Sequence, residues 1–298
     1  MDKVTVCIST RRRPDGLMEL LQSINTINLP ENTELSIVVV ENDSQSVSDK
    51  VVQEFAAQSR FKTNYYLETN QGISHARNRS VKEAGNCDFV CFVDDDQIVD
   101  KNWMAELMKC QREYNCDGVS GATPALFRFD VPEYIVDHHK DIEKPYGEIV
   151  KQAATGCLLL RKSLVDKLEG PFDIRLNFTG GEDFFMTSQI TKIGGIIRIN
   201  HKAISHEIIP PGRTTVKYVM KRTIRTANTQ LIVRSLTGEK VSKVKILPHI
   251  LGRLLLGIVV FVPYYLFGKS NKLLGLFKIC YSIGGLMFVF GRSNRFYK

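Results

Sequence analysis

Three consecutive aspartates, Asp94, Asp95 and Asp96, are the side chains in this sequence best suited to chemistry, and they follow an apolar run at residues 89–93. Adjacent carboxylates repel one another, so keeping all three ionised calls for a cation. Mg²⁺ and Mn²⁺ prefer oxygen ligands and are commonly held by one or two carboxylates together with substrate phosphates. A solvated loop is the alternative, but the position directly after a predicted buried strand favours a metal and diphosphate site.

A second acidic pair, Glu182 and Asp183, follows Gly180 and Gly181 at the predicted start of a helix. The dipole of a helix favours ionised carboxylates at its N-terminus, which suits a general base. Simple N-capping by an acid is the alternative. Two glycines followed by two acids exceed what a cap requires, so the pattern favours a catalytic role.

Polar residues between these acids form a weaker pattern around Asn70, Gly72, Arg77 and Asn78. Gly72 permits a tight turn before a predicted helix, and Arg77 and Asn78 lie within that helix. An ordinary helix N-terminus with polar surface groups explains the same residues equally well.

His206 and Arg213 follow the apolar and basic segment at residues 196–204. A lone histidine is more often structural than a ligand. Near a diphosphate, however, His206 could complete the coordination of a metal and Arg213 could neutralise phosphate charge.

The elements that must position these residues alternate between strands and helices along the first hundred residues. The apolar runs predict strands at residues 4–9, 35–40, 63–67 and 89–93, with helices at residues 15–27, 50–58 and 74–83. This alternation predicts an α/β fold with a mostly parallel sheet and helices on both faces. Ligands bind beyond the C-terminal ends of such strands, and the polar clusters at residues 10–13, 41–44 and 94–96 all follow strand ends. Further on, we expect a strand at residues 156–160 and a helix at residues 184–193.

The last third of the chain differs in charge and apolar content. Residues 213–298 hold 16 Lys and Arg but a single acid, Glu239, whereas residues 1–212 carry a net charge of −7. Residues 246–267 and 273–290 are each near the length of roughly 20 residues that is needed to cross a bilayer. A membrane-inserted hairpin is slightly favoured over helices lying in the interface, where Arg253 and Lys278 would be better tolerated. A buried helical pair in a soluble domain is a further alternative.

The aromatic residues in this basic region lie inside apolar runs, which suits lipid better than the stacking of nucleic-acid bases. Seven cysteines without C-x-x-C spacing argue against a disulfide framework or a zinc site and fit a reducing compartment. The first ten residues lack the pattern of a secretory signal. We therefore expect a protein at the cytoplasmic face of the cell membrane that does not bind nucleic acid.

Six segments in order resemble the family 2 glycosyltransferases, which are inverting enzymes with the GT-A (Rossmann-like) fold. The resemblance covers about residues 3–213 and is far more specific than a lone D-x-D. Ser9 stands where the family usually has proline, and Glu41 where aspartate is commoner, which leaves the nucleotide base less certain. The matching segments are CISTRRRP, VVVENDS, NQGISHARN, FVDDDQIVDKNW, TGCLLLRKS and GPFDIRLNFTGGEDFFM.

The resemblance implies roles for most of the residues above. Thr10 and Arg13 would line the nucleotide pocket, and Glu41 would contact the base. On this resemblance the donor would be held by Asn70, Arg77, Asn78 and Asp94, the metal by Asp94 and Asp96, and the acceptor would be activated by Asp183 with Glu182 beside it. The chemistry of the residues, apart from the resemblance, adds Asp95 and Arg213 to the donor site and His206 to the metal site.

The predicted organisation is a glycosyltransferase domain at residues 1–213, a basic helical connector at residues 214–245 and a membrane-associated hairpin at residues 246–298. The expected reaction is transfer of one sugar from a nucleotide-diphosphate sugar to a hydroxyl acceptor, a lipid-linked or surface glycan, with Mg²⁺ or Mn²⁺. The processive Q-x-x-R-W signature is absent, which favours a single transfer. The alternatives are a nucleotidyltransferase, although residues 10–14 lack its glycine-rich loop, and a catalytically silent binding protein of the same fold.

Overall fold

The structure, a computed structural model, describes residues 1–139, 144–267 and 272–293. The chain forms two compact units, which are described separately. Unit 1 contains Met1–Arg128, His139–Asn177 and Glu182–Ile209, and unit 2 contains Phe129–His138, Phe178–Gly181 and Pro210–Lys298. The predicted boundaries at residues 213 and 245 stay predictions.

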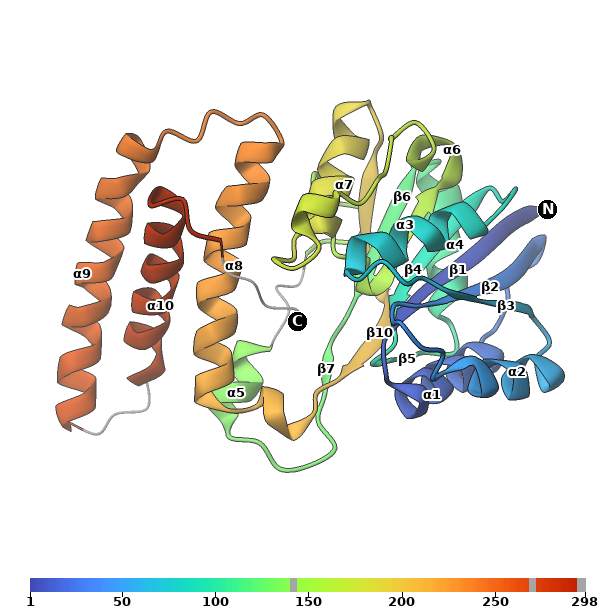
Figure 1. The fold of residues 1–298 in the computed structure, drawn as a ribbon, viewed down its shortest axis with the longest axis horizontal. Coiled ribbons are helices and arrows are strands. Elements are labelled where there is room, and N and C mark those ends of the chain that lie inside the picture. The colour runs from blue at the N-terminus through green and yellow to red at the C-terminus, as the bar shows by residue number, and fades with distance from the viewer. Residues whose placement is uncertain (140–143, 268–271, 294–298) are drawn as a thin grey trace. The chain divides into compact units, whose positions relative to one another are not determined.

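Unit 1 is built on a sheet with the strand order β3-β2-β1-β4-β9-β6-β10-β5, and β7 and β8 pair with β10 (Figure 1). Strands β3, β2, β1 and β4 pair in parallel, as the alternation of elements predicted. Strand β9 is antiparallel to both β4 and β6, and β10 is antiparallel to β5 and β8. The sheet is therefore parallel in its N-terminal half and mixed beyond it. The strands are β1 (Asp2–Thr10), β2 (Thr33–Glu41), β3 (Lys62–Leu67), β4 (Phe89–Asp94), β5 (Gln97–Val99), β6 (Gly118–Ala122), β7 (Ala125–Leu126), β8 (Ile149–Val150), β9 (Leu158–Arg161) and β10 (Ile197–Ile208).

Helices cover both faces of this sheet, in agreement with the predicted architecture. Val6 and Ile8 of β1 point into one core with α1 (Pro14–Asn25), α2 (Asp49–Gln58) and α4 (Trp103–Tyr114). Cys7 points into the other core, with α3 (Ile73–Glu83), α6 (Lys162–Val165) and α7 (Glu182–Lys192). Because successive side chains of a strand alternate between faces, near-continuous apolar strands need both layers. The predicted strand at residues 156–160 starts later than expected, at Leu158, because Thr155–Cys157 forms the 3₁₀ helix η1. A second 3₁₀ helix, η2, spans Ile174–Leu176.

Unit 2 is helical in the residues that the structure describes. It contains α5 (Glu133–His138), the short η3 (Pro211–Arg213), α8 (Val216–Leu236), α9 (Lys243–Phe267) and α10 (Lys272–Val289). Helix α8 confirms the predicted basic helix, and α9 and α10 confirm the two apolar helices. The residues between the two predicted apolar segments, 268–272, lie almost wholly outside the described residues. Of the described helices, one has a segment, Lys243–Phe261, that is long and apolar enough to cross a membrane.

Candidate active site

Three parallel strands of unit 1 bring their polar C-terminal residues to one edge of the sheet. Thr10 of β1 pairs with Glu41 of β2, and Ser9 pairs with Asp94 of β4. The expectation that the first three polar clusters meet at the C-terminal strand ends is therefore confirmed. This edge is where ligands bind in open α/β sheets.

The aspartate triplet is held by groups from the end of β1. Asp95 is buried, and its Oδ2 accepts a hydrogen bond from Thr10 Oγ1 at 2.8 Å. Arg13 Nη1 lies 3.0 Å from both Asp95 Oδ1 and Asp96 Oδ2. Burial raises the pKa of Asp95 to about 6, although Arg13 opposes the shift. Thr10 and Arg13 therefore lie beside the carboxylates, and in this structure Arg13 supplies compensating positive charge. Their predicted place in a nucleotide pocket stays a prediction.

Arg77 joins the aspartate triplet to the second acidic pair. Its Nη2 donates to Asp94 Oδ1 at 2.9 Å, and its Nη1 donates to Glu182 Oε1. The guanidinium is buried and lies 5.7 Å from the centre of the Phe172 ring. Acids that are almost 90 residues apart in sequence are thus held in one cluster. The two acidic motifs singled out from the sequence therefore meet through one arginine.

The acidic pair begins α7, as its sequence pattern indicated. The two preceding glycines have φ of 79° and 91°, which other residues rarely adopt. Burial raises the pKa of Glu182 to about 7 and raises that of Asp183, and in both cases Arg77 opposes the shift. Asp183 Oδ1 accepts a hydrogen bond from the backbone N–H of Phe184 at 2.7 Å. A half-buried carboxyl group with a raised pKa is a better proton acceptor than an ordinary aspartate when ionised.

Glu41 is fully buried and its carboxylate is engaged within the protein. It accepts hydrogen bonds from the backbone of Val47 and Ser48, both at 2.9 Å, and from Tyr65 Oη at 2.7 Å. These contacts fix the segment after β2. A role for Glu41 in contacting the base stays a prediction, and shaping the surrounding loop is the role that its contacts support.

Asn70 and Asn78 also have structural contacts. The Asn70 carbonyl oxygen accepts from Asn42 Nδ2 at 2.7 Å, and Asn42 Oδ1 accepts from Gly72 N at 2.7 Å. Asn78 exchanges two hydrogen bonds with the backbone of Phe172, at 2.8 and 2.9 Å. Asn78 therefore anchors the segment that precedes the acidic pair, and its predicted contact with the donor is untested.

Two residues of the matching motifs were not singled out from the sequence, Arg12 and Asp43. Arg12 has a φ of 54°, and its guanidinium hydrogen-bonds both oxygens of Asp43. The Arg12 guanidinium holds the pKa of Asp43 at about 2. The arginine run after β1 and the polar run after β2 were the available signal, but spacing alone did not say which members pair.

The metal ligands predicted from the sequence are gathered only in part. Asp94 and Asp96 flank Asp95 at the sheet edge, whereas His206 Nε2 lies 3.0 Å from Asp100 Oδ1. Within the part of the chain that the structure describes, no group of three or more His, Cys, Asp or Glu is spaced to enclose a metal alone. Two partly exposed carboxylates fit a divalent ion whose remaining ligands are phosphate oxygens and water. Arg213 belongs to unit 2, so its proximity to these residues stays a prediction.

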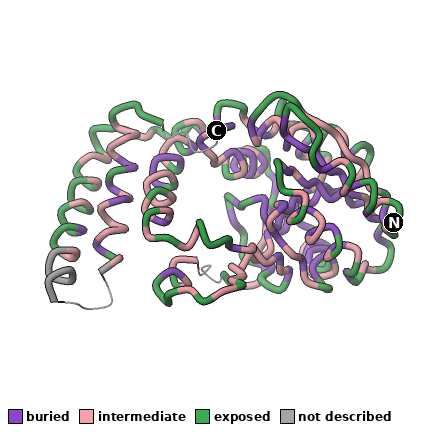
Figure 2. The backbone as a smooth tube through the Cα atoms, turned by 60° about the horizontal axis from the view of Figure 1, so that its bottom comes forward, coloured by how far each residue is buried: buried purple, intermediate pink, exposed green. Residues whose placement is uncertain are grey.

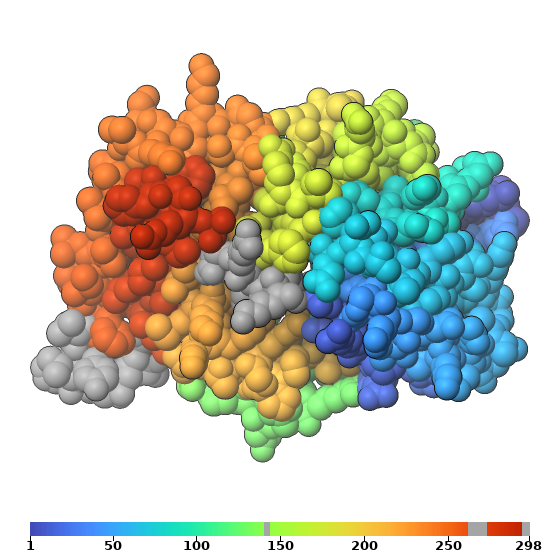
Figure 3. All heavy atoms as spheres, in the orientation of Figure 1, coloured from blue at the N-terminus to red at the C-terminus, as the bar shows by residue number. Residues whose placement is uncertain are grey.

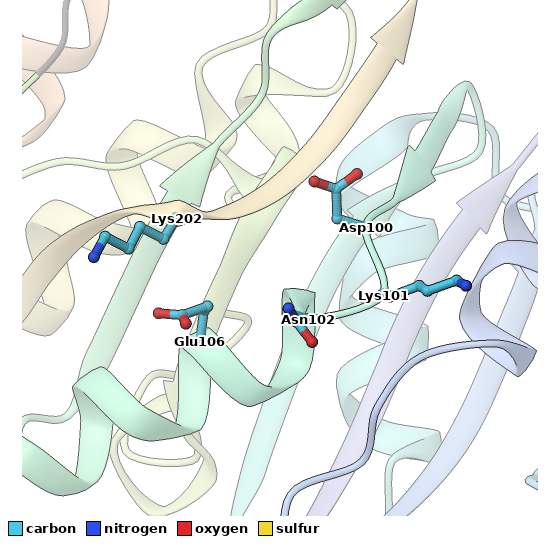
Figure 4. A pocket seen from close by; sticks show the side chains of 5 residues that line it. All are labelled: Asp100, Lys101, Asn102, Glu106 and Lys202. Atoms are coloured by element: carbon cyan, nitrogen blue, oxygen red, sulfur yellow. The ribbon is translucent and has the colours of Figure 1, made fainter.

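A pocket of about 430 Å³ lies outside this cluster. Figure 4 shows its lining side chains, which come from the segment after β5, from α4 and from β10. It contains none of the predicted site residues, although His206 contacts Asp100 at its wall. Its lining mixes both signs of charge: Asp100, Lys101, Asn102, Glu106 and Lys202. Nothing in its composition matches diphosphate chemistry better than the carboxylate cluster does.

Comparison with known proteins identifies the class of enzyme to which this fold and carboxylate edge belong. The model of the Glycosyl transferase family 2 matches residues 5–168, which is more than half of the chain. The chain therefore belongs to this family and is a glycosyltransferase. The resemblance inferred from the six sequence segments is confirmed.

Among curated proteins, the chain is similar to the succinoglycan biosynthesis protein ExoM of Rhizobium meliloti. The two are 27% identical over 228 residues, which cover 76% of this chain and 73% of ExoM. This chain is also 29% identical over 143 residues to the poly(ribitol-phosphate) β-N-acetylglucosaminyltransferase TarS of Staphylococcus aureus. The match covers 45% of this chain but only 24% of TarS.

Solved structures agree on the fold. The mannosyltransferase PcManGT of Pyrobaculum calidifontis, in complex with GDP-Man and Mn²⁺, matches with a TM-score of 0.67 at 15% identity over 97% of this chain and 88% of that one. TarS residues 1–349 of S. aureus, in complex with UDP-GlcNAc, match with a TM-score of 0.56 at 16% identity over 99% and 93%. The fold is therefore GT-A, as predicted.

Proposed function

We propose that this glycosyltransferase inverts the anomeric carbon as it transfers a single sugar from a nucleotide-diphosphate donor to a hydroxyl acceptor. The observation that carries this proposal is the Arg77 bridge between Asp94 and Glu182, because it gathers two acidic motifs with different tasks into one cluster. One motif suits diphosphate and metal, and the other suits the acceptor.

Asp183 is the proposed base. It would accept the proton of the acceptor hydroxyl as that oxygen attacks the anomeric carbon from the face opposite the leaving nucleotide. One displacement needs one base and no covalent intermediate, so the configuration inverts. Glu182, held by Arg77, would orient the start of α7 and keep Asp183 in position.

Asp94, Asp95 and Asp96 would hold the donor, with Asp94 and Asp96 as the carboxylate ligands of Mg²⁺ or Mn²⁺. When bound, the ion would supply Lewis-acid stabilisation of the charge that develops on the diphosphate. Arg13 and Arg77, which now neutralise these acids, lie where they could also bind phosphate oxygens. The Mn²⁺ and GDP-Man bound to PcManGT, a protein of the same fold, support this use of the edge.

The acceptor proposed here is a lipid-linked or surface glycan at the cytoplasmic face of the membrane. The similarity to ExoM, a succinoglycan biosynthesis protein, supports a glycan acceptor. The basic and apolar C-terminal third supports a membrane location. A nucleotidyltransferase would need a nucleoside triphosphate instead, so donor choice separates the two functions.

The test is a panel of sugar nucleotides and nucleoside triphosphates, assayed for donor turnover with Mn²⁺. We expect turnover of a sugar nucleotide alone. Asp183→Asn should then lower transfer by about 1,000-fold or more with donor binding retained, because the base is lost but the diphosphate site is not. Asp96→Ala should weaken metal-dependent donor binding.

Asp166→Asn is the matched control, because this aspartate is half-exposed and pairs with Lys162 on α6, away from the carboxylate cluster. It should leave transfer and donor binding unchanged. Full transfer by Asp183→Asn would remove the base role, and triphosphate turnover without sugar-nucleotide turnover would overturn the proposed reaction.

A further inference from the structure

Helix α10 lies between α8 and α9 within unit 2 and packs on both of them (Figure 1). On the α8 side, Asn228 Nδ2 donates to the carbonyl oxygen of Gly284 at 3.2 Å, and Tyr281 Oη donates to Gln230 Oε1 at 2.6 Å. A Cβ on Gly284 would lie 2.2 Å from the carbonyl oxygen of Ile224, so the two helices touch through their backbones. Helix α10 is therefore a packed element of unit 2.

The opposite side of α10 packs just as closely on α9. A Cβ on Gly257 would lie 2.9 Å from the Ile279 side chain, and one on Gly275 would lie 2.5 Å from the backbone of Phe261. Because α10 is fixed on both sides, α9 cannot enter a bilayer as a hairpin with α10 unless α8 goes with them. Helix α8 carries five cations along its length, namely Lys217, Lys221, Arg222, Arg225 and Arg234. That many charges in hydrocarbon would be prohibitive.

The face of α9 that points away from α10 is apolar and exposed. Figure 2 colours most residues of the segment 243–261 as exposed, and in Figure 3 the described atoms of α9 form the side of unit 2 that is away from α8. Six large apolar side chains of α9 are exposed by 44 to 81% of their area, and only 6% of the segment Lys243–Phe261 is buried. These side chains are Val244, Leu251, Leu255, Leu256, Ile258 and Val259. So much contiguous apolar surface marks an interaction site.

One edge of this apolar face is basic. Lys245, His249 and Arg253 follow one another at four-residue spacing, which places them in one row along the helix. Arg253 lies over the Tyr281 ring, with its guanidinium carbon 4.4 Å from the ring centre, so the row is held against α10. The sequence from residue 240 to its end contains no aspartate or glutamate.

We propose that this face of α9, defined by Val244, Leu251, Leu255 and Val259 with its basic row, docks in the plane of an anionic membrane surface. The apolar side chains would enter the boundary between headgroups and acyl chains, and the row would contact lipid phosphates. The helix lies in the interface and does not cross the bilayer, because crossing would place Arg253 near mid-membrane. This proposal rests on the proposed function, because the surface would bring the enzyme to the membrane that holds the proposed acceptor.

Charge also decides between a bilayer and a second copy of the chain as the occupant. A two-fold dimer would bring this face against itself. The basic rows of two copies would then approach each other with no carboxylate on α9 or α10 to pair with them. An anionic lipid surface complements the same face.

Binding of the full chain to vesicles of phosphatidylcholine alone, or with phosphatidylglycerol at about 30%, tests the proposal. We expect flotation with the anionic vesicles and much less with the neutral ones. Leu255→Ser combined with Val259→Ser should weaken binding roughly tenfold or more, through lost apolar burial. Lys245→Gln should weaken it about fivefold at low salt. Ile149→Ser with Ile196→Ser is the matched control, because both are exposed apolar side chains of unit 1, and it should change nothing.

Tryptophan placed at Val244, Leu251 or Val259 in turn measures the orientation of the helix. The chain's only natural tryptophan, Trp103, is fully buried in unit 1, so it gives a constant background. Lipids that carry bromine at different depths should quench the fluorescence of all three introduced tryptophans best when the bromine lies close to the headgroups. Deep quenching of Leu251→Trp with shallow quenching of the other two indicates a crossing helix and overturns the in-plane assignment.

Two further outcomes overturn the proposal: absence of binding to either vesicle, and a concentration-dependent dimer that Leu255→Ser with Val259→Ser dissolves. Turnover of sugar nucleotide with a water-soluble acceptor is measured on the same samples. Vesicle binding without turnover would count against the proposed reaction alone, and turnover without vesicle binding would count against the docking surface alone.

Discussion

The carboxylate edge of unit 1 and the basic helices of unit 2 use positive charge in opposite ways. At the edge, Arg13 and Arg77 each contact two carboxylates, and Arg77 is buried while it does so. The C-terminal third has 16 cations and one acid, so most of its cations have no carboxylate partner available within that stretch of sequence. Positive charge is balanced by neighbouring carboxylates in the first region and outnumbers the acids of its own stretch of sequence in the second.

The difference matches what each region is proposed to bind. A site for a diphosphate and a divalent ion needs acids held close together, and acids held close need compensation in the absence of ligand. A surface for anionic lipid needs the reverse, because internal carboxylates would cancel its attraction. Positive charge therefore organises the site in unit 1, whereas in unit 2 it would serve the proposed recognition of lipid.

Removal of divalent metal should separate the two regions most strongly. With EDTA we expect sugar transfer to fall by about 100-fold or more, because Lewis-acid stabilisation of the leaving diphosphate is worth several kcal/mol. Adding Mn²⁺ or Mg²⁺ should restore transfer. Binding to anionic vesicles, measured on the same samples, should be unaffected. Full transfer in EDTA would contradict the metal role.

Loss of the Arg77 bridge should give the largest change in stability. Arg77→Ala leaves Glu182 buried without its partner, and we expect the free energy of unfolding to fall by about 3–5 kcal/mol at neutral pH. Chemical denaturation of the metal-free protein measures this change.

Arg234→Ala is the matched control for Arg77→Ala, because Arg234 pairs with Glu239 at 2.7 Å while both side chains are about half exposed. Exposed pairs contribute little, so we expect a change within about 0.5 kcal/mol. Equal effects of the two substitutions would contradict the contrast between the regions.

The raised pKa of Glu182 predicts a pH dependence of stability. Its pKa is about 7 in the folded protein and 4.5 when unperturbed, so the folded state binds the proton more tightly between these values. Stability from this group is present below about pH 4.5 and is lost as the pH rises towards 7. Relative to Glu182→Gln, the wild-type protein should lose on the order of 2 kcal/mol over this interval. Chemical denaturation of both proteins without metal at pH 4.5 and 7.5 measures this loss. An equal change in the free energy of unfolding between the two pH values in both proteins would refute the prediction.

The first half of the fold could be predicted because local pattern and topology agree there. Strands β1, β2 and β4 are apolar on both faces and each ends in a polar cluster, so a parallel sheet with a common polar edge was the simple solution. The antiparallel insertion of β9 between β4 and β6 could not be predicted, because a short apolar run carries no information about its direction.

The site was predictable by residue type and less so by partner. Motif and strand position selected Asp94 and Asp183, but nothing in their spacing indicated that Arg77 would join the two motifs. His206 was assigned to the metal by its chemistry alone, whereas its hydrogen bond to Asp100 depends on the antiparallel pairing of β5 with β10. Such pairings depend on long-range topology, which local sequence does not encode.

The smallest predicted effect tests the outward charge of the C-terminal third at its single acid. Glu239→Gln removes the partner of Arg234, and because the pair is half-exposed, thermal unfolding should shift little. The same change removes a negative charge and so raises the net charge of the region next to α9 by one. Affinity for anionic vesicles should therefore rise a few-fold at low salt, about what one cation near the surface contributes, and the gain should vanish in high salt. Glu34→Gln, an equal change of charge at an exposed position of β2, should leave vesicle affinity unchanged. If both variants gain affinity equally, net charge alone governs binding and the contrast between the two regions fails.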